Sequence, residues 1–381
     1  MKRLAIVRQK YNPAGGAERI VSAILRQLRG GGGLRPLLIT RNWEAVDGIE
    51  AARVKPFYLG SVWRDWGFAR AARRAWREAG ADLVQSHERI PGCDIFRAGD
   101  GVHAAWLEAR LEGKTWLARL ATFCNPYHHY MLRTERAMFL HPSLRAVICN
   151  SELVRNDVTR RFGVPAARCE VIYNGVDSAF FHPREARRTR AELRERYGIE
   201  QDAPVLVYVG SGFERKGVAQ ALNAIAAHPS VRLVVVGGDK KLARYRRLAE
   251  TLGIGGRVRF VGPQRDVRGF YGMADGFILP TLYEPFGSVV AEAMACGLPV
   301  LTSARCGGAE LLEEGETGWV APALDAGHWQ RNVASWLASR GRWSEMGDRA
   351  RARVEALSEE SMVAQMLALY RRLLSEREGR R

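Results

Sequence analysis

The stretch GFILPTLYEPFGSVVAEAMACGLPV, residues 276–300, holds a strand, a helix and the start of a second strand, in that order. GFILP, which opens it, is an apolar run of the length of a buried strand. A helix is predicted from Gly287 and Ser288 to about Ala295, because CGLP then places a glycine at the helix stop and a proline beyond it. The apolar run PVLTS, at 299–303, follows at once. This succession is typical of a parallel α/β sheet.

The same alternation extends through the whole chain. In the second half, near-continuous apolar runs predict strands at 205–210, 231–237, 258–262, 276–280 and 299–303. In the first half, strands are predicted at 3–7, 36–40, 82–86 and 145–150, with a glycine-terminated helix at 16–29. At roughly 100 to 200 residues per domain, a chain of 381 residues suggests two domains. The expected fold class is therefore α/β with two Rossmann-like domains.

Domain boundaries are expected where the alternation is interrupted. YNGVDSAFFHPREARR, residues 173–188, combines a turn, an aromatic pair and a proline before a charged helix, which is typical of a connection between domains. We expect an N-terminal domain over 1–175, a nucleotide-binding domain over 176–355 and a last helix over 356–381. The C-terminal helices are arginine-rich and amphipathic, and we expect some of them to pack back on the first domain.

The charge of the chain is strongly positive. Lys and Arg number 58 against 41 Asp and Glu, which gives a formal net charge of +17. Such an excess favours polyanionic partners, among them nucleic acid, an anionic membrane surface and a phosphorylated substrate. The alternative is the arginine preference of a genome rich in G and C, which would imply no partner.

The composition also indicates a compartment. No apolar run reaches the roughly 18 residues of a membrane span, and the N-terminal apolar stretch is too short for a signal-peptide core. The six cysteines form no CxxC pair and have no histidine at metal-ligand spacing. We therefore expect a cytoplasmic protein with free thiols.

A glycine-rich turn follows the first predicted strand. In YNPAGGAER, residues 11–19, Gly15 and Gly16 permit close approach of a ligand to the backbone, and the helix behind them points its N–H groups at any anion there. The turn lacks both the GxGxxG order and the GK[ST] of a P-loop. A tight turn between strand and helix that binds no ligand is the alternative.

A second turn, VGSGFERKGV at 209–218, carries two cations. Arg215 and Lys216 would project from the carboxyl end of a strand, where open α/β sheets bind their ligands. Two cations there could neutralise a pyrophosphate, Arg through its planar fork and Lys as a point charge. A solvated basic loop is the alternative.

Two glutamates bracket the start of the helix in the opening stretch. Glu284 precedes the helix and Glu292 lies inside it. A carboxylate has no donors, so neither residue can bind phosphate, but both can accept hydrogen bonds from sugar or ribose hydroxyls. The helix N-terminus supplies donors for hydroxyls and phosphate oxygens. For Glu292, a simple favourable charge near a helix N-terminus is the alternative.

These motifs together resemble the retaining nucleotide-sugar glycosyltransferases of family 4, over nearly the whole chain. The resemblance rests on the Glu-x7-Glu spacing after a strand, the basic Arg-Lys turn and the glycine-rich N-terminal turn. The greatest similarity is to lipopolysaccharide core glucosyltransferases, and it lies in the stretches HERIPGCDIFRAGDGVH, GFERKGV and PQRDV. The resemblance implies the GT-B architecture, in which two Rossmann-like domains face each other across a cleft. It also implies transfer of a hexose, glucose from UDP-glucose, to a heptose of the lipopolysaccharide core.

The resemblance assigns roles to the donor-side residues. Arg215 and Lys216 would hold the diphosphate and stabilise the leaving UDP, as a metal does in other transferase folds. Glu292 would accept from the ribose and Glu284 from the sugar. The remaining expected contacts are main-chain amides of Phe286, Gly287, Ser288 and Val289, closure by Gly15 and Gly16 on the diphosphate, and QRDV at 264–267 near the base.

No cofactor is expected, and no metal site. The sequence contains no DxD triad, so we expect transfer without a metal ion. In the first domain, Asp100 and His103 of AGDGVHAAW are candidate catalytic residues, because members of the family place a histidine around here against the donor sugar. A structural hydrogen bond is the alternative for either residue. The resemblance also implies that the anomeric configuration of the sugar is retained. In this family retention is discussed as a same-face internal return, in which the departing phosphate assists deprotonation of the acceptor.

Two aromatic and basic stretches suit a helix lying in a lipid headgroup region. SVWRDWGFARAARRAWREAG at 61–80 and HAAWLEARLEGKTWLARLATF at 103–123 both mix tryptophans with cations. An ordinary amphipathic helix covering the sheet is the alternative for 61–80. For 103–123 the resemblance implies contact with the membrane. The expected location is therefore peripheral, on the inner face of the inner membrane, next to a lipid-linked core oligosaccharide acceptor.

Three alternatives to this function remain at this point. The same chemistry could act on another acceptor, such as an exopolysaccharide lipid carrier or a diacylglycerol. A basic nucleic-acid-binding protein with a nucleotide fold would need an exposed basic and aromatic groove, and nothing in the sequence resembles a nucleic-acid module. We therefore expect no nucleic-acid partner. A nicotinamide dehydrogenase would need GxGxxG after a strand, of which VGSGFERKG has only part.

Overall fold

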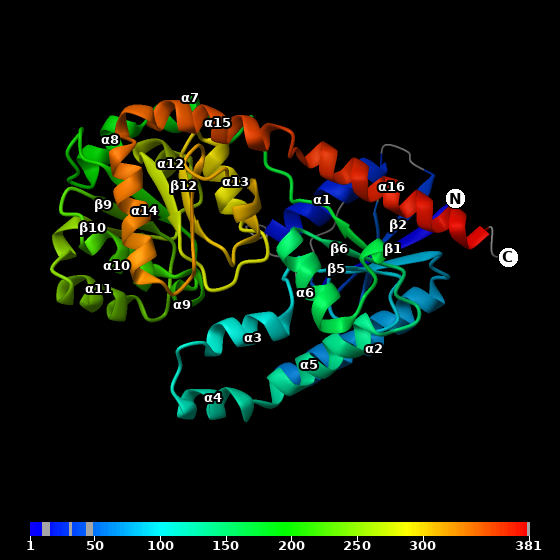
Figure 1. Cartoon of the computed structure of the whole chain (residues 1–381). Helices are drawn as coiled ribbons and strands as arrows, with labels where there is room; N and C mark the ends of the chain where they lie inside the picture. Colours follow the sequence, from blue (N-terminus) through cyan, green and yellow to red (C-terminus); the bar gives the residue numbers. More distant parts are fainter. Residues whose placement is uncertain (10–15, 30–32, 43–48, 379–381) are drawn as a thin grey trace. The chain divides into compact units, whose positions relative to one another are not determined.

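The structure is a computed structural model of the chain, and it describes residues 1–9, 16–29, 33–42 and 49–378. The chain divides into two compact units (Figure 1). The first unit combines Met1–Asn174 with Glu359–Arg381, and the second is Gly175–Ser358. The last helix therefore belongs to the unit that contains the N-terminus.

The first unit is built on a parallel sheet that has seven strands among the described residues, in the order β3-β2-β1-β4-β5-β6-β7. The strands are β1 (Lys2–Val7), β2 (Leu34–Thr40), β3 (Glu50–Arg53), β4 (Leu83–Ser86), β5 (Ile95–Arg97), β6 (Ala146–Cys149) and β7 (Cys169–Val171). The order starts from a central β1 and grows first to one side and then to the other, as in doubly wound folds. The carboxyl ends of β1 and β4, at the reversal, are where such folds bind ligands.

Helices cover both faces of this sheet. They are α1 (Gly16–Arg29), α2 (Gly60–Glu78), α3 (His103–Leu111), α4 (Trp116–Phe123), α5 (Pro126–Phe139), α6 (Glu152–Phe162) and α16 (Glu359–Glu378). Figure 1 shows α1 and α16 on one side of the sheet, and α2 with α5 on the other. Such two-sided cover explains why β4 and β6 are buried along their whole length, and β1 over its last four residues.

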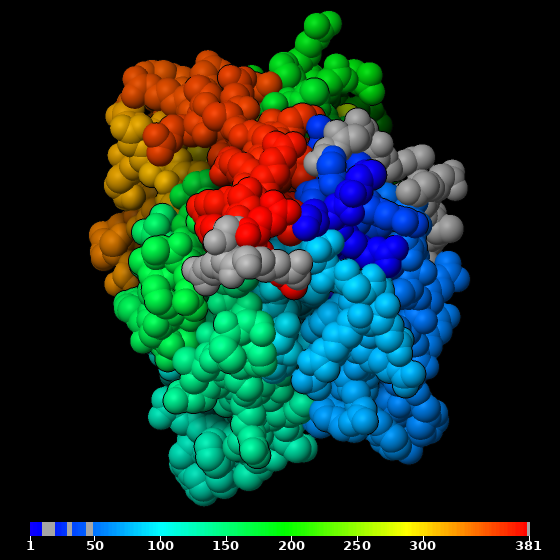
Figure 2. All heavy atoms as spheres, turned by 90° about the vertical axis from the view of Figure 1, so that its right-hand side faces the viewer, coloured from blue at the N-terminus to red at the C-terminus, as the bar shows by residue number. Residues whose placement is uncertain are grey.

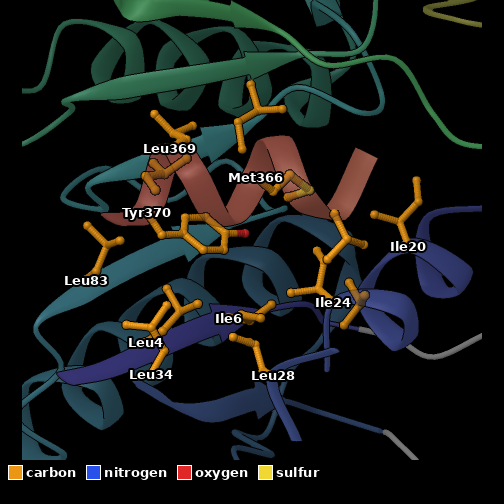
Figure 3. Close-up of a cluster of buried hydrophobic side chains, with 14 of the residues drawn as sticks. Leu4, Ile6, Ile20, Ile24, Leu28, Leu34, Leu83, Met366, Leu369 and Tyr370 are labelled. Atoms are coloured by element: carbon orange, nitrogen blue, oxygen red, sulfur yellow. The ribbon is translucent and has the colours of Figure 1, made fainter. Parts of the chain in front are cut away.

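The C-terminal helix completes the core of the first unit. Met366, Leu369 and Tyr370 of α16 point toward the strands and toward α1 (Figure 3). On α1, buried Ile24 and Leu28 lie four residues apart, which places them on one face of the helix. The expectation that a C-terminal helix packs back on the first domain is confirmed for α16.

Polar contacts fix the position of α16 on the sheet. The Tyr370 hydroxyl donates to Gln85 Oε1 of β4 at 2.7 Å, and both side chains are buried. Near the end of the helix, Lys2 Nζ lies 3.0 Å from Glu378 Oε1. Figure 2 shows the red C-terminal helix beside the dark blue N-terminal segment. The first and last elements of the chain therefore stabilise each other.

The second unit is built on a parallel sheet with six strands among the described residues, in the order β10-β9-β8-β11-β12-β13. The strands are β8 (Val205–Val209), β9 (Arg232–Val236), β10 (Val258–Gly262), β11 (Gly276–Leu279), β12 (Val300–Ser303) and β13 (Gly318–Ala321). The helices are α7 (Pro183–Arg187), α8 (Arg190–Arg196), α9 (Phe213–Lys216), α10 (Val218–Ala226), α11 (Leu242–Thr251), α12 (Arg268–Met273), α13 (Ser288–Ala295), α14 (Ala326–Ala338) and α15 (Trp343–Glu355). Here β8 and β11 lie at the reversal of strand order.

The predicted strands are present, and the described residues form four more strands in the two sheets. These four are β3, β5, β7 and β13. β3 has the sequence EAAR and is mostly exposed at the edge of its sheet, so it offers no apolar run to detect. β5 and β7 have only three residues each. Short or exposed strands are held by their neighbours rather than by their own pattern.

The stretch 103–123, which suits a helix in a headgroup region, is divided between two helices. Helix α3 ends at Leu111 and α4 begins at Trp116, with Gly113 between them at a φ of +68°. For 61–80, α2 buries Phe68, Ala72 and Trp76, which agrees with a helix that covers the sheet. No helix among the residues that the structure describes is long and apolar enough to cross a bilayer.

The packing of α16 leads to a stability prediction. Replacing buried Met366 by Ala should lower the free energy of unfolding by about 2 to 5 kcal/mol, because it leaves a cavity between α16 and the sheet. Gln365→Ala, at the exposed neighbouring position, is the control and should stay within about 0.5 kcal/mol of the parent. Chemical denaturation measures both. Equal stability of the two variants would contradict the assignment of α16 to this core.

Candidate nucleotide-sugar site

The turn after β8 is locked to the end of β11. The backbone carbonyl of Arg215 accepts from the N–H of Leu282 at 2.8 Å and from the Thr281 hydroxyl at 3.0 Å. A Cβ on Gly217 would lie 1.8 Å from the Pro280 carbonyl oxygen, and its φ is +78°. Only glycine permits this approach. The two loops therefore behave as one rigid surface at the carboxyl ends of two neighbouring strands.

The loop after β11 is fixed in turn to the loop after β12. Glu284 N–H donates to the Arg305 carbonyl at 2.9 Å, and Gly307 N–H donates to the Glu284 carbonyl at 2.9 Å. Gly287 has a φ of +78°, and a Cβ there would come within 2.8 Å of Cys306 Sγ. The backbone on both sides of Glu284 is therefore held before α13 begins at Ser288.

Three charged side chains meet on this surface. Arg215 Nη1 donates to Glu284 Oε2 at 2.7 Å and to the Tyr283 carbonyl at 3.1 Å, and Lys216 Nζ lies 3.4 Å from the same Oε2. The Glu284 and Lys216 side chains are each 14% exposed and that of Arg215 is 37% exposed. The cluster carries one net positive charge at the surface. It can attract an anion, while Glu284 limits the repulsion between the two cations.

The electrostatics of Glu284 follow from this arrangement. Burial alone would raise the pKa of the carboxyl, but the charges of Lys216 and Arg215 and their hydrogen bonds outweigh it, so the pKa is lowered. The carboxylate is therefore ionised at neutral pH. Both of these contacts are made by Oε2, and no described residue is in hydrogen-bond contact with Oε1. That oxygen can accept a hydrogen bond from a hydroxyl.

The N-terminus of α13 lies beside the three charges. Gly287 is the N-cap and supplies no side-chain cap to the first turn. Phe286 and Gly287 are buried, whereas Ser288 and Val289 are half-buried. The positive end of the helix adds to the field of Arg215 and Lys216. The structure therefore brings these predicted residues together with Glu284.

Glu292 lies further along α13 and is buried. Its exposed fraction is 6%, and its Oε2 accepts from the Tyr271 hydroxyl at 3.0 Å. The same hydroxyl lies 3.5 Å from the Val289 carbonyl oxygen. Tyr271, from α12, is a residue that the sequence analysis missed, because nothing in the local sequence GFYGM distinguishes it from a core aromatic residue. The structure gives Glu292 a protein partner of its own, separate from the Arg215–Lys216 cluster.

The other candidate residues belong to the first unit. Gly15 lies outside the described residues, and Gly16 is the first residue of α1. Asp100 is exposed and its Oδ2 lies 3.7 Å from Arg8 Nη1. The His103 ring contacts His128 Nδ1 at 3.2 Å. Asp100 and His103 therefore have different partners, and neither is part of the second unit's cluster.

His103 is held in a low-pKa environment. Burial, followed by the charge of Arg89, lowers the pKa of His103 to about 3, so the imidazole is neutral at physiological pH. Buried Glu135 accepts from His103 N–H at 2.8 Å, from Ala104 N–H at 3.2 Å and from Arg89 Nε at 2.9 Å. This carboxylate acts as the cap that α3 otherwise lacks. Sequence reasoning missed it, because Glu135 lies 32 residues away in α5.

The residues that the structure describes contain no group of three or more His, Cys, Asp or Glu that could hold a metal ion.

Two family models match the chain in succession. The model described as Glycosyltransferase Family 4 matches residues 14–180, and the model described as Glycosyl transferases group 1 matches residues 189–353. The first match lies almost wholly in the first unit, and the second lies entirely in the second unit. Each unit therefore corresponds to one glycosyltransferase domain.

Individual proteins show the same likeness. The lipopolysaccharide glucosyltransferase WaaG of Escherichia coli is 29% identical over 318 residues, which are 82% of this chain and 83% of that protein. A crystal structure of WaaG matches with a TM-score of 0.79 and 24% identity, covering 96% of this chain and 99% of that one. A structure of Anabaena HepE in complex with UDP-glucose matches with a TM-score of 0.71 and 19% identity, covering 97% and 99%. These matches confirm the expected GT-B fold.

The close approach at Gly217 leads to a prediction with an internal control. Gly217→Ala and Gly212→Ala both place a side chain at a φ of +78°, so both should cost about 1 to 2 kcal/mol in backbone strain. Only at position 217 does the added Cβ meet the Pro280 carbonyl oxygen, whereas position 212 has nothing within 4 Å. Thermal unfolding should therefore show a much larger loss for Gly217→Ala. Equal losses would mean that the two loops are not locked together.

Proposed function

Because the chain is a glycosyltransferase of the GT-B type, with a family 4 domain followed by a group 1 domain, we propose that it transfers glucose from UDP-glucose to a heptose of the lipopolysaccharide core. The observation that supports this most is the meeting of Arg215, Lys216 and Glu284 beside the N-terminus of α13. These groups offer positive charge for a diphosphate and a carboxylate oxygen for a sugar hydroxyl. A nucleotide sugar is the substrate class that needs both.

The proposed donor contacts follow from the chemistry of each group. Arg215 and Lys216 bind the diphosphate and stabilise the charge that develops on the leaving UDP. Glu284 accepts from a sugar hydroxyl through Oε1. Glu292 accepts from the ribose, with Tyr271 holding its other oxygen. The remaining proposed contacts are the main-chain amides of Phe286, Gly287, Ser288 and Val289.

In this proposal the first unit contributes the acceptor side, and the glycine-rich turn with Gly15 and Gly16 keeps the role in diphosphate binding that the family resemblance implies. Neutral His103 can exchange hydrogen bonds with the donor sugar, and exposed Asp100 can accept from a hydroxyl of the acceptor. Configuration is retained, with the departing phosphate assisting deprotonation of the acceptor on the same face. No side chain is required as a covalent nucleophile.

The acceptor is proposed to be lipid-linked, with the protein bound peripherally to the inner face of the inner membrane. Helix α4 supports this, because none of its residues is buried. Trp116, Leu117, Leu120 and Phe123 recur on one face of the helix and are 50% to 71% exposed. A net charge of +17 adds attraction to anionic lipid. Such a face suits the boundary between headgroups and acyl chains.

The test of this function is a donor and acceptor screen. Purified protein is given UDP-glucose, UDP-galactose, UDP-N-acetylglucosamine or GDP-mannose, each with and without a heptose-terminated core acceptor, and release of the nucleoside diphosphate is measured. Release should be fastest with UDP-glucose and should depend on the acceptor. Transfer only to diacylglycerol or to a lipid-carrier saccharide would contradict the proposed heptose acceptor. Release of nucleoside diphosphate from GDP-mannose alone would contradict UDP-glucose as the donor.

The same assay tests metal independence. Arg215 and Lys216 supply the positive charge that metals supply in other transferase folds, so EDTA should leave the rate unchanged. Loss of activity in EDTA that Mg²⁺ restores would contradict this part of the proposal.

A variant of Lys216 tests the proposed leaving-group role. Lys216→Ala should lower the rate of transfer by about 10²- to 10³-fold, because one of the two cations at the diphosphate is lost. The control is Lys55→Ala, which removes an exposed lysine between β3 and α2 and should leave the rate unchanged. A near-normal rate for Lys216→Ala, with the fold intact by circular dichroism, would exclude Lys216 from the mechanism.

A further inference from the structure

A hollow of about 660 Å³ lies between α2 and α5, within the first unit and apart from the residues given roles above. Figure 1 shows the two helices side by side on one face of the sheet. We call this cavity the α2–α5 hollow. Helix α2 lines it with Trp66 and Arg73, and α5 lines it with His129, Tyr130 and Arg133. Its volume is within the usual range for small-molecule sites.

The hollow is cationic. Arg73 and Arg133 both line it, and no carboxylate does so among the described residues. Neither guanidinium has an ion-pair partner in the part of the chain that the structure describes. By contrast, neighbouring Arg64 on α2 is paired with Asp65 at 2.7 Å, and Arg74 is paired with Glu78 at 2.6 Å. The two arginines of the hollow are therefore available to a ligand of opposite charge.

Neutral donors and ring surfaces accompany the two cations. The Tyr130 hydroxyl hydrogen-bonds with Thr134, and burial raises the pKa of Tyr130, so the phenol stays protonated. Trp66 and His129 line the hollow with their rings. Two guanidinium forks next to hydroxyls match a phosphomonoester, which presents three oxygens for charge-assisted hydrogen bonds. A phosphodiester presents only two such oxygens.

The surroundings of the hollow point to a lipid rather than a dissolved ion. The exposed apolar face of α4 ends at Phe123, and α5 begins at Pro126, which itself lines the hollow. The rings of Phe123 and His129 are 5.0 Å apart, so the apolar face and the hollow are continuous. If α4 lies at the boundary of the acyl chains, cations beside it lie at headgroup level.

We propose that the α2–α5 hollow binds the phosphomonoester headgroup of a membrane lipid through Arg73 and Arg133. The proposal rests on the membrane contact of α4 that is part of the proposed function. It adds to that contact a specific site, which discriminates between headgroups of the same charge, where a diffuse basic surface would not.

The experiment measures vesicle binding by the full-length protein. Phosphatidylcholine vesicles contain either phosphatidic acid, a phosphomonoester, or phosphatidylglycerol, a phosphodiester, adjusted to equal zeta potential. The unmodified protein should bind the phosphatidic acid vesicles at least tenfold more tightly. The double variant Arg73→Gln with Arg133→Gln should lose this preference. Its binding to phosphatidylglycerol vesicles should fall only as far as the loss of two positive charges from these helices explains, which the control variant described next measures.

The control removes the same charge from the same two helices. Arg70→Gln with Arg136→Gln changes two exposed arginines, one on α2 and one on α5, that do not line the hollow. This pair should weaken binding to both kinds of vesicle equally and keep the preference for phosphatidic acid. Equal behaviour of the two double variants would overturn the proposal, because the attraction would then be diffuse.

A further arm separates a lipid from a dissolved ligand. Glycerol 3-phosphate is titrated into the protein without vesicles, and Arg73-dependent binding as tight as that to phosphatidic acid vesicles would overturn the lipid as the source. These measurements do not involve sugar transfer, so they remain informative if the protein has another donor or acceptor. Conversely, loss of the headgroup preference would leave the UDP-glucose assay with soluble acceptor unaffected.

Discussion

The candidate site depends on the parallel pairing of β8 with β11 and on the lack of a side chain at Gly217. Parallel pairing brings the carboxyl ends of both strands to one edge of the sheet, so the loops that follow them must share the same space. The Pro280 carbonyl occupies the position that a Cβ on Gly217 would need. Two hydrogen bonds to the Arg215 carbonyl then align the loops. Side-chain positions at the site follow from this backbone contact.

The charge balance of the cluster follows from the same contact. Two cations from one loop would repel each other if no acid were near, and the second loop supplies Glu284 to both of them. Burial and ion pairing act on this carboxyl in opposite directions, and ion pairing prevails. Because one acid faces two bases, positive charge remains for an anion. The unbalanced charge is therefore a property of the fold rather than of the overall composition.

The sequence predicted those features that are set by residues close together in the chain. Continuous motifs contain the buried strands, the helix after Gly287 and the residues Arg215, Lys216 and Glu284. The structure brings those three side chains together. Contacts between distant segments left no such signal. Tyr271 meets Glu292 across 21 residues, and Glu135 meets His103 across 32. The edge strand β3 could not be predicted either, because its register comes from β2 and not from its own residues.

The arm formed by α3, α4 and α5 combines a fixed base with an apolar end. At its base, buried Glu135 accepts hydrogen bonds from the start of α3 and from Arg89. These donors are therefore satisfied without water. At its far end, α4 buries none of its residues and exposes Trp116 and Phe123. Folding of the unit alone gives no reason for large apolar side chains at that position, because they gain nothing from the core. Their position on a well-anchored arm is explained if burial occurs outside the protein, at a surface that the arm meets in a defined orientation.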